Sequence, residues 1–191
     1  MSRAALARLP AECVERDPNL DWLQRILTAQ RAGRSCLPLH LGLDPQTHTA
    51  LIQACFSERA GQYLGAPPQA RERDALRAEL LELRRDEWRE LRDLLLAGRA
   101  GRAGEAVVAA VVAAACLGGD HLWRDLGLAS RDELRALLEY NFPRLAARNV
   151  QNMRWKKFFY RQLCEQDGAY VCRSPSCQAC PTYHDCFGEE S

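Results

Sequence analysis

Apolar residues recur every three to four positions along most of this 191-residue chain, which is the period of an α-helix. Asp17-Pro18 and Asp44-Pro45 each place a capping side chain before a proline, so a helix is expected to begin at each proline. Gly33 suits the end of the first helix, and Ser130 with Glu133 forms a capping box that predicts another start. Strand-like alternation and internal repeats are lacking. The pattern predicts an all-α fold.

The segment 69–97 is predicted to be one long amphipathic helix, preceded by a loop over residues 61–68. Arginine and glutamate fill most of its faces, and one stripe is apolar. The short length of this stripe favours packing on the domain's own core over a coiled-coil partner. The stripe consists of Leu76, Leu80, Leu83, Trp88, Leu91 and Leu95.

Residues 105–117 are apolar on all sides and predict the buried central helix of the fold. Cys116 at its end is interpreted as a small buried hydrophobe. The longest apolar run has twelve residues, whereas a membrane-spanning helix needs about 20. A short helix capped by Asp120, a helix opened by the capping box and a last helix over residues 150–166 complete the expected body.

The charge composition does not indicate a nucleic-acid or membrane partner. The 26 lysines and arginines are balanced by 25 aspartates and glutamates, so no global field draws the protein to nucleic acid or to a membrane. The N-terminus lacks the apolar core of a signal peptide, which indicates a cytoplasmic protein in a reducing compartment. We expect a monomer with one structural domain: an N-terminal helical segment (1–36), a helical body (37–168) and a cysteine-rich tail (169–191).

Four of the nine cysteines lie in the tail with the spacing C-x4-C-x2-C-x5-C. An odd number cannot pair completely, and clustered cysteines in a reducing compartment favour metal binding over disulfides. Structural zinc sites commonly use two separated C-x2-C pairs, whereas a multi-iron cluster accepts unequal gaps. Spacing therefore favours an iron–sulfur cluster over zinc, and it leaves two alternatives open: a zinc-stapled interaction module and a simple iron–sulfur electron-transfer protein. The four candidate ligands are Cys172, Cys177, Cys180 and Cys186.

The last predicted helix has an apolar arc, which should face the core, and an opposite basic arc. The basic arc is interpreted either as a solvated face or as a surface that faces the tail. In the second case its cations would stabilise thiolates around a metal and could attract an oxyanion. The basic arc holds Arg154, Lys157, Arg161 and Cys164, and His184 in the tail is a further candidate for the surroundings of the metal.

Residues 154–165 followed by the four-cysteine tail resemble the C-terminal region of the NifQ family, whose hallmark is the same cysteine spacing. Residues 41–44, 116–128 and 130–134 are also similar to that family, so the resemblance covers the chain from about residue 37 to its end. The tail with the preceding helix is the specific part of this resemblance, and the upstream pieces are suggestive only.

The resemblance implies an iron–sulfur protein of nitrogen fixation that carries molybdenum, with a mixed Mo–Fe–S cluster as one form of the cargo. It implies delivery of molybdenum for biosynthesis of the iron–molybdenum cofactor, with the four tail cysteines as cluster ligands. The partners implied are the nitrogenase cofactor scaffold, the nitrogenase iron protein and molybdate. A carrier is expected rather than an enzyme, because the chain has no Ser–His–Asp grouping, phosphate loop or HExxH motif. Cys164 and His121 have open roles, with an inert thiol and a helix-start residue as the simpler interpretations.

Overall fold

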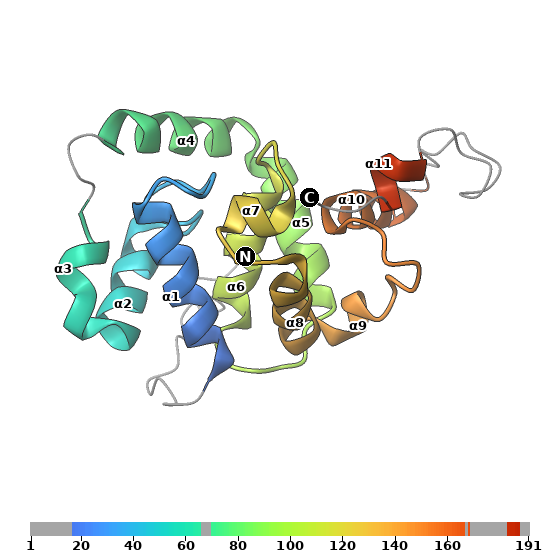
Figure 1. Ribbon diagram of the computed structural model, residues 1–191, viewed down its shortest axis with the longest axis horizontal. Coiled ribbons are helices and arrows are strands. Elements are labelled where there is room, and N and C mark those ends of the chain that lie inside the picture. The colour runs from blue at the N-terminus through green and yellow to red at the C-terminus, as the bar shows by residue number, and fades with distance from the viewer. Residues whose placement is uncertain (1–16, 66–69, 167, 169–182, 188–191) are drawn as a thin grey trace.

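The computed structural model describes residues 17–65, 70–166, 168 and 183–187, and within these ranges every regular element is a helix (Figure 1). The predicted all-α fold is therefore confirmed for the described part of the chain. None of the helices in these ranges is both long enough and apolar enough to cross a bilayer. The elements are α1 (Pro18–Arg31), α2 (Pro45–Cys55), a 3-10 turn (Ser57–Arg59), α3 (Ala60–Tyr63), α4 (Arg71–Leu83), α5 (Arg85–Ala97), α6 (Glu105–Cys116), α7 (Leu122–Leu126), α8 (Arg131–Asn141), α9 (Pro143–Ala146), α10 (Trp155–Gln166) and α11 (Tyr183–Phe187).

Three of the predicted helix starts, at Asp17, Asp44 and Ser130, form as their sequence signals indicate. Asp17 accepts a hydrogen bond from the backbone N–H of Asn19 at 2.9 Å, and Asp44 accepts one from Thr47 at 2.9 Å. Each aspartate satisfies a backbone donor that has no partner inside its own helix. The capping box at Ser130 also forms. These starts depend only on neighbouring residues, which is why the sequence predicts them.

Helix α6 is the centre of the molecule, and the other helices surround it (Figure 1). All of its residues except Ala106 are buried, including Cys116, as its continuous apolar composition predicts. Helix α5 packs along it, and the indole N–H of Trp88 donates to the carbonyl of Ala110 at 3.0 Å. This central helix supports the elements that carry the candidate site.

The single helix predicted over residues 69–97 is wrong, because the described part of this segment forms two helices, α4 and α5. The helix breaks at Arg84, whose backbone leaves the helical region with φ −111° and ψ 28°. The Arg84 guanidinium holds this corner by donating to the carbonyl of Leu117 at 2.8 Å and to the carboxylate of Glu87. A contact between residues 33 positions apart therefore sets the break.

Helix α4 turns a polar face toward the body. Asp74 is buried and accepts a hydrogen bond from the Gln30 amide at 3.1 Å, and Arg77 donates to the carbonyl of Leu37 at 3.3 Å. The expected apolar stripe is wrong for this half, because its three leucines are exposed: Leu76 by 56%, Leu80 by 51% and Leu83 by 76%.

Two further boundaries differ from the expectation. Helix α3 extends into the loop expected from residue 61, because the buried ring of Tyr63 packs edge-on against Phe56. Helix α10 begins at Trp155 rather than at Val150, which is 86% exposed. The Asn149 side chain takes the place of a helical turn there, with hydrogen bonds of 2.8 Å to both the N–H and the carbonyl of Met153.

Candidate metal centre

Cys186 is the tail cysteine that the structure describes, and it lies on α11 beside the start of α10 (Figure 1). Its carbonyl accepts a hydrogen bond from the backbone N–H of Arg154 at 2.7 Å. Its side chain is half-buried and forms no disulfide. Cys172, Cys177 and Cys180 lie outside the described residues. The end of the tail is thus held against the first residue of the predicted basic arc.

The residues of the basic arc differ in exposure and in partners along α10. Arg154 at the start of the helix is half-buried, and Lys157 one turn later is exposed. Arg161 in the next turn is exposed and pairs with Glu165 at 2.8 Å. Cys164 at the far end is half-buried with a free thiol. The structure therefore brings Cys186 to the Arg154 end of the arc.

His184 also lies on α11, where its side chain is exposed. Its ring is edge-on to the neighbouring ring of Tyr183, with centroids 6.0 Å apart. Across the described part of the chain, no group of three or more His, Cys, Asp or Glu side chains is arranged to hold a metal ion. Because three of the four tail cysteines lie outside that part, their assignment as ligands stays a prediction.

Sequence reasoning missed Lys156, which joins α10 to the body through Asp125. Its ammonium pairs with the Asp125 carboxylate and donates to the carbonyl of Gly118 at 2.8 Å. Both side chains are largely buried, with 17% of Lys156 and 7% of Asp125 exposed. On a helical wheel Lys156 lies at the border of the apolar arc, so its position alone does not reveal a buried partner.

Asp125 is a junction between segments that lie far apart in the chain. Besides Lys156, its carboxylate accepts the backbone N–H of Asp120 at 3.0 Å. Its carbonyl accepts the hydroxyl of Ser35 at 2.7 Å and the N–H of Cys36 at 3.1 Å. Gly118 is needed beside it, because a Cβ there would lie 2.4 Å from a carboxylate oxygen of Asp125. The junction fixes the start of α10, and with it the contact to Cys186, on the body.

A cavity of about 290 Å³ lies between the start of α7 and the start of α10. The sequence predicts Asp120 as the cap of α7, but the cap position belongs to His121, and Asp120 instead accepts the His121 N–H at 2.7 Å. His121 is therefore a helix-start residue, as predicted, and it also lines the cavity. The wall consists of Gly119, Asp120, His121, Leu122, Arg154, Trp155, Lys156 and Lys157.

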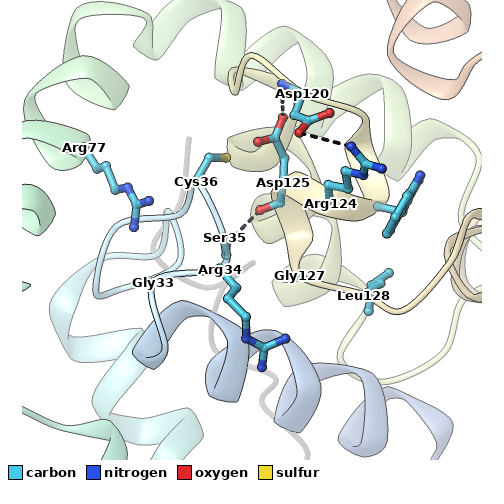
Figure 2. A pocket seen from close by; sticks show the side chains of 11 residues that line it. Gly33, Arg34, Ser35, Cys36, Arg77, Asp120, Arg124, Asp125, Gly127 and Leu128 are labelled. Atoms are coloured by element: carbon cyan, nitrogen blue, oxygen red, sulfur yellow. Dashed lines mark hydrogen bonds and ion pairs between the residues drawn. The ribbon is translucent and has the colours of Figure 1, made fainter. Parts of the chain in front are cut away.

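Asp125 lines a second cavity, of about 500 Å³, and Figure 2 shows the Cys36 thiol between Arg77 and Asp125. Burial raises the pKa of Cys36 to about 12, and the neighbouring Asp125 carboxylate also raises it. Burial likewise raises the pKa of Cys116 to about 12. Both thiols stay protonated near neutral pH, and a protonated thiol is a poor metal ligand.

The described cysteines differ in bonding and in place. Cys55 is disulfide-bonded, which differs from the general expectation of reduced cysteines. Cys36, Cys116, Cys164 and Cys186 form no disulfide. Cys116 ends the central helix and the Cys36 thiol lies 3.8 Å from the carbonyl of Ala115 in the same helix, whereas Cys186 lies on α11. The geometry thus separates two thiols at the central helix from the thiol at the end of the tail.

Comparison with known proteins gives one family. The family model described as NifQ matches residues 22–188, so the match begins earlier than the expected residue 37. Protein NifQ of Azotobacter vinelandii is 64% identical over 171 residues, which cover 88% of each chain. Protein NifQ of Klebsiella pneumoniae is 42% identical over 174 residues, which cover 89% of this chain and 99% of the relative. No solved structure matches the chain.

Proposed function

This chain belongs to the NifQ family of nitrogen fixation, and on that premise we propose that it carries molybdenum for assembly of the nitrogenase iron–molybdenum cofactor. In this proposal Cys172, Cys177, Cys180 and Cys186 hold an iron–sulfur cluster, and molybdenum is the cargo. The protein acts as a cytoplasmic carrier rather than as an enzyme. Its proposed partners are the nitrogenase cofactor scaffold and the nitrogenase iron protein.

The observation that carries the proposal is the place of Cys186. The hydrogen bond between Arg154 and the Cys186 carbonyl joins the end of the tail to a helix that the Asp125–Lys156 pair fixes on the body. A carrier must both hold and release its cargo. A half-buried thiol beside a fixed helix suits that task better than a thiol in the core.

Two cysteines outside the tail support the same choice by contrast. Burial raises the pKa of Cys36 and of Cys116, so it disfavours the thiolate form of both side chains. Thiolates and sulfide are the ligands that iron–sulfur chemistry requires. Those two cysteines are therefore poor alternatives to the tail as ligands.

The charge near Cys186 also fits a cluster with thiolate ligands. Four thiolates bring net negative charge, and cations of the basic arc, which meets Cys186 at the backbone of Arg154, would favour their deprotonated form. When bound, the cluster supplies sulfide, a soft ligand that retains a thiophilic metal. The protein's own part is to hold the last cysteine beside a cationic helix start.

Metal analysis of one anaerobic preparation tests the proposal. We expect iron and acid-labile sulfide with brown absorption, and molybdenum after loading with molybdate. One zinc per chain without iron would support the zinc-stapled interaction module instead. Iron and sulfide that never accompany molybdenum would support a simple electron-transfer protein.

Cysteine variants locate the ligands. Replacement of any one tail cysteine by alanine should abolish stable cluster binding, because each thiolate is one of the bonds that hold the cluster. Cys116→Ala is the matched control, since Cys116 is a buried protonated thiol and alanine is also a small apolar residue. Equal iron loss in Cys116→Ala and Cys186→Ala would contradict the assignment of the ligands to the tail.

A further inference from the structure

We propose that the outer face of α4 is a docking surface for a helix of a partner protein, and that this helix presents an apolar stripe beside lysines or arginines. The outer face consists of Glu72, Leu76, Glu79, Leu80 and Leu83. The proposal is independent of the metal chemistry of the tail, because the face lies wholly on α4.

The leucines of α4 form an apolar stripe that faces solvent. Leu76 is 56% exposed, Leu80 51% and Leu83 76%, and their spacing places them on one side of the helix. Six large apolar side chains are exposed in the described part of the chain, and half of them are these three. Single exposed leucines are common on protein surfaces, whereas a contiguous apolar row is typical of a surface that binds another protein.

The opposite face of α4 holds the helix on the body, so the stripe faces away from the core. Asp74 is buried, and Arg77 donates to the carbonyl of Leu37 at 3.3 Å. Arg73 lies against Gly33, where an added Cβ would come 2.5 Å from its Nη1. Figure 1 shows α4 along the outer edge of the molecule, with the other helices on one side of it. The stripe is therefore open to a partner.

The charge beside the stripe gives the chemistry of the partner. Glu72 and Glu79 are exposed and lie two turns apart along one edge of the stripe. On the other edge, Arg73 and Arg77 are held against the body. An apolar row with an acidic edge suits a helix that has an apolar row with a basic edge, because opposite charges then meet beside the buried leucines. The same acidic edge disfavours an anionic membrane surface.

A second copy of this chain fits the face less well. Helix α4 has 13 residues, fewer than two heptads, whereas a coiled coil needs about three to four. Two antiparallel copies of α4 would place their acidic edges side by side, where like charges repel. In a parallel pair the glutamates would need Arg77 and Arg84 as partners, and both guanidiniums already donate to carbonyls of their own chain. The face therefore suits a helix of a different protein.

Peptide binding to the full-length protein tests the surface. The probe is a fluorescently labelled synthetic peptide of about three heptads, with leucine at positions a and d and lysine at e and g. A second peptide carries glutamate in place of every lysine. Fluorescence anisotropy should show that the lysine peptide binds at least about tenfold more tightly than the glutamate peptide, and that salt weakens its binding.

Replacement of the stripe separates docking from folding. The triple variant Leu76→Gln, Leu80→Gln and Leu83→Gln should weaken binding of the lysine peptide about tenfold or more, because the apolar row is lost. Val150→Gln is the matched control, since Val150 is 86% exposed and lies outside α4. Unchanged binding in the triple variant would overturn the docking surface. The single variant Leu83→Gln repeats the test at the most exposed of the three leucines and should weaken binding by a smaller factor.

Replacement of the acidic edge tests the charge of the partner. The double variant Glu72→Gln and Glu79→Gln should weaken binding of the lysine peptide about fivefold and reduce its salt dependence, because two ion pairs are lost. Glu58→Gln with Glu90→Gln is the matched control, since it removes the same charge from exposed positions outside the face. Equal effects of the two double variants would overturn the role of the acidic edge.

The two peptides and the protein alone decide which occupant the face has. Binding of neither peptide, or equal binding of both, overturns the proposed partner. Sedimentation of the protein alone tests the second copy. A monomer agrees with the proposal, whereas a dimer that the triple variant converts to a monomer would assign the face to a second copy instead.

Discussion

Helices α4 and α5 follow each other in the chain and each has 13 residues, yet they meet the body in opposite ways. In α5, Leu91 and Leu95 are fully buried against α6. In α4, Leu76 and Leu83 are more than half exposed, and the buried side chain is Asp74. Two segments with the same leucine-rich, charged composition therefore use different faces.

The difference shows what helical periodicity can establish. A stripe at helical spacing predicts a helix, and for α5 it also predicts the buried face. For α4 it predicts the helix only, because hydrogen bonds from Gln30 to Asp74 and from Arg77 to the body hold the polar face inward. One straight helix would have to bury the same face along its whole length. The break at Arg84 allows α4 and α5 to bury different faces.

The largest expected effect is in the apolar half. Leu95→Ala removes a fully buried side chain next to α6 and should lower the free energy of unfolding by about 3 kcal/mol, within the range for such core truncations. Urea denaturation followed by circular dichroism measures the change. The matched variant Leu80→Ala should change it by less than about 0.5 kcal/mol, since Leu80 is 51% exposed.

Equal losses of unfolding free energy in Leu95→Ala and Leu80→Ala would contradict the difference between α5 and α4. They would mean that the outer face of α4 is covered in solution.

A smaller effect is expected at the polar contact of α4. Asp74→Ala leaves the buried Gln30 amide without its partner and should cost about 1–3 kcal/mol. Glu72→Ala, an exposed change in the same helix, is the control. If Asp74→Ala is as stable as the unmodified chain, the polar face of α4 does not contribute to stability.

The smallest effect is expected when the exposed leucines of α4 are replaced together by glutamine. Each position should change the free energy of unfolding by no more than about 0.5 kcal/mol, because the side chains already contact water. Thermal unfolding of the triple variant Leu76→Gln, Leu80→Gln and Leu83→Gln measures the sum. A loss of several kcal/mol would show that α4 is also held through apolar contacts, as α5 is.

The features of the fold that sequence predicts are those that neighbouring residues determine. The caps at Asp17, Asp44 and Ser130 and the buried helix α6 belong to this class, because a capping side chain or an unbroken apolar run acts within a few positions. The break at Arg84 does not belong to it, since the carbonyl of Leu117 that holds this corner is distant in sequence.

The candidate site divides in the same way. The spacing of the tail cysteines is a local pattern, so the sequence alone is enough to name Cys186 as a candidate ligand. The pairing of Lys156 with Asp125 depends on packing between distant segments, so a helical wheel shows only a lysine at the edge of the core. Cys172, Cys177 and Cys180 lie outside the described residues, and their role as ligands stays a prediction.

The junction at Asp125 also orders events as the chain leaves the ribosome. Its backbone carbonyl binds Ser35 and Cys36, which are synthesised earlier, whereas its carboxylate pairs with Lys156, which is synthesised later. The domain therefore cannot complete this junction until residue 156 has been synthesised. Cys172, Cys177, Cys180 and Cys186 follow Lys156 in the chain, so every residue of the junction is synthesised before them.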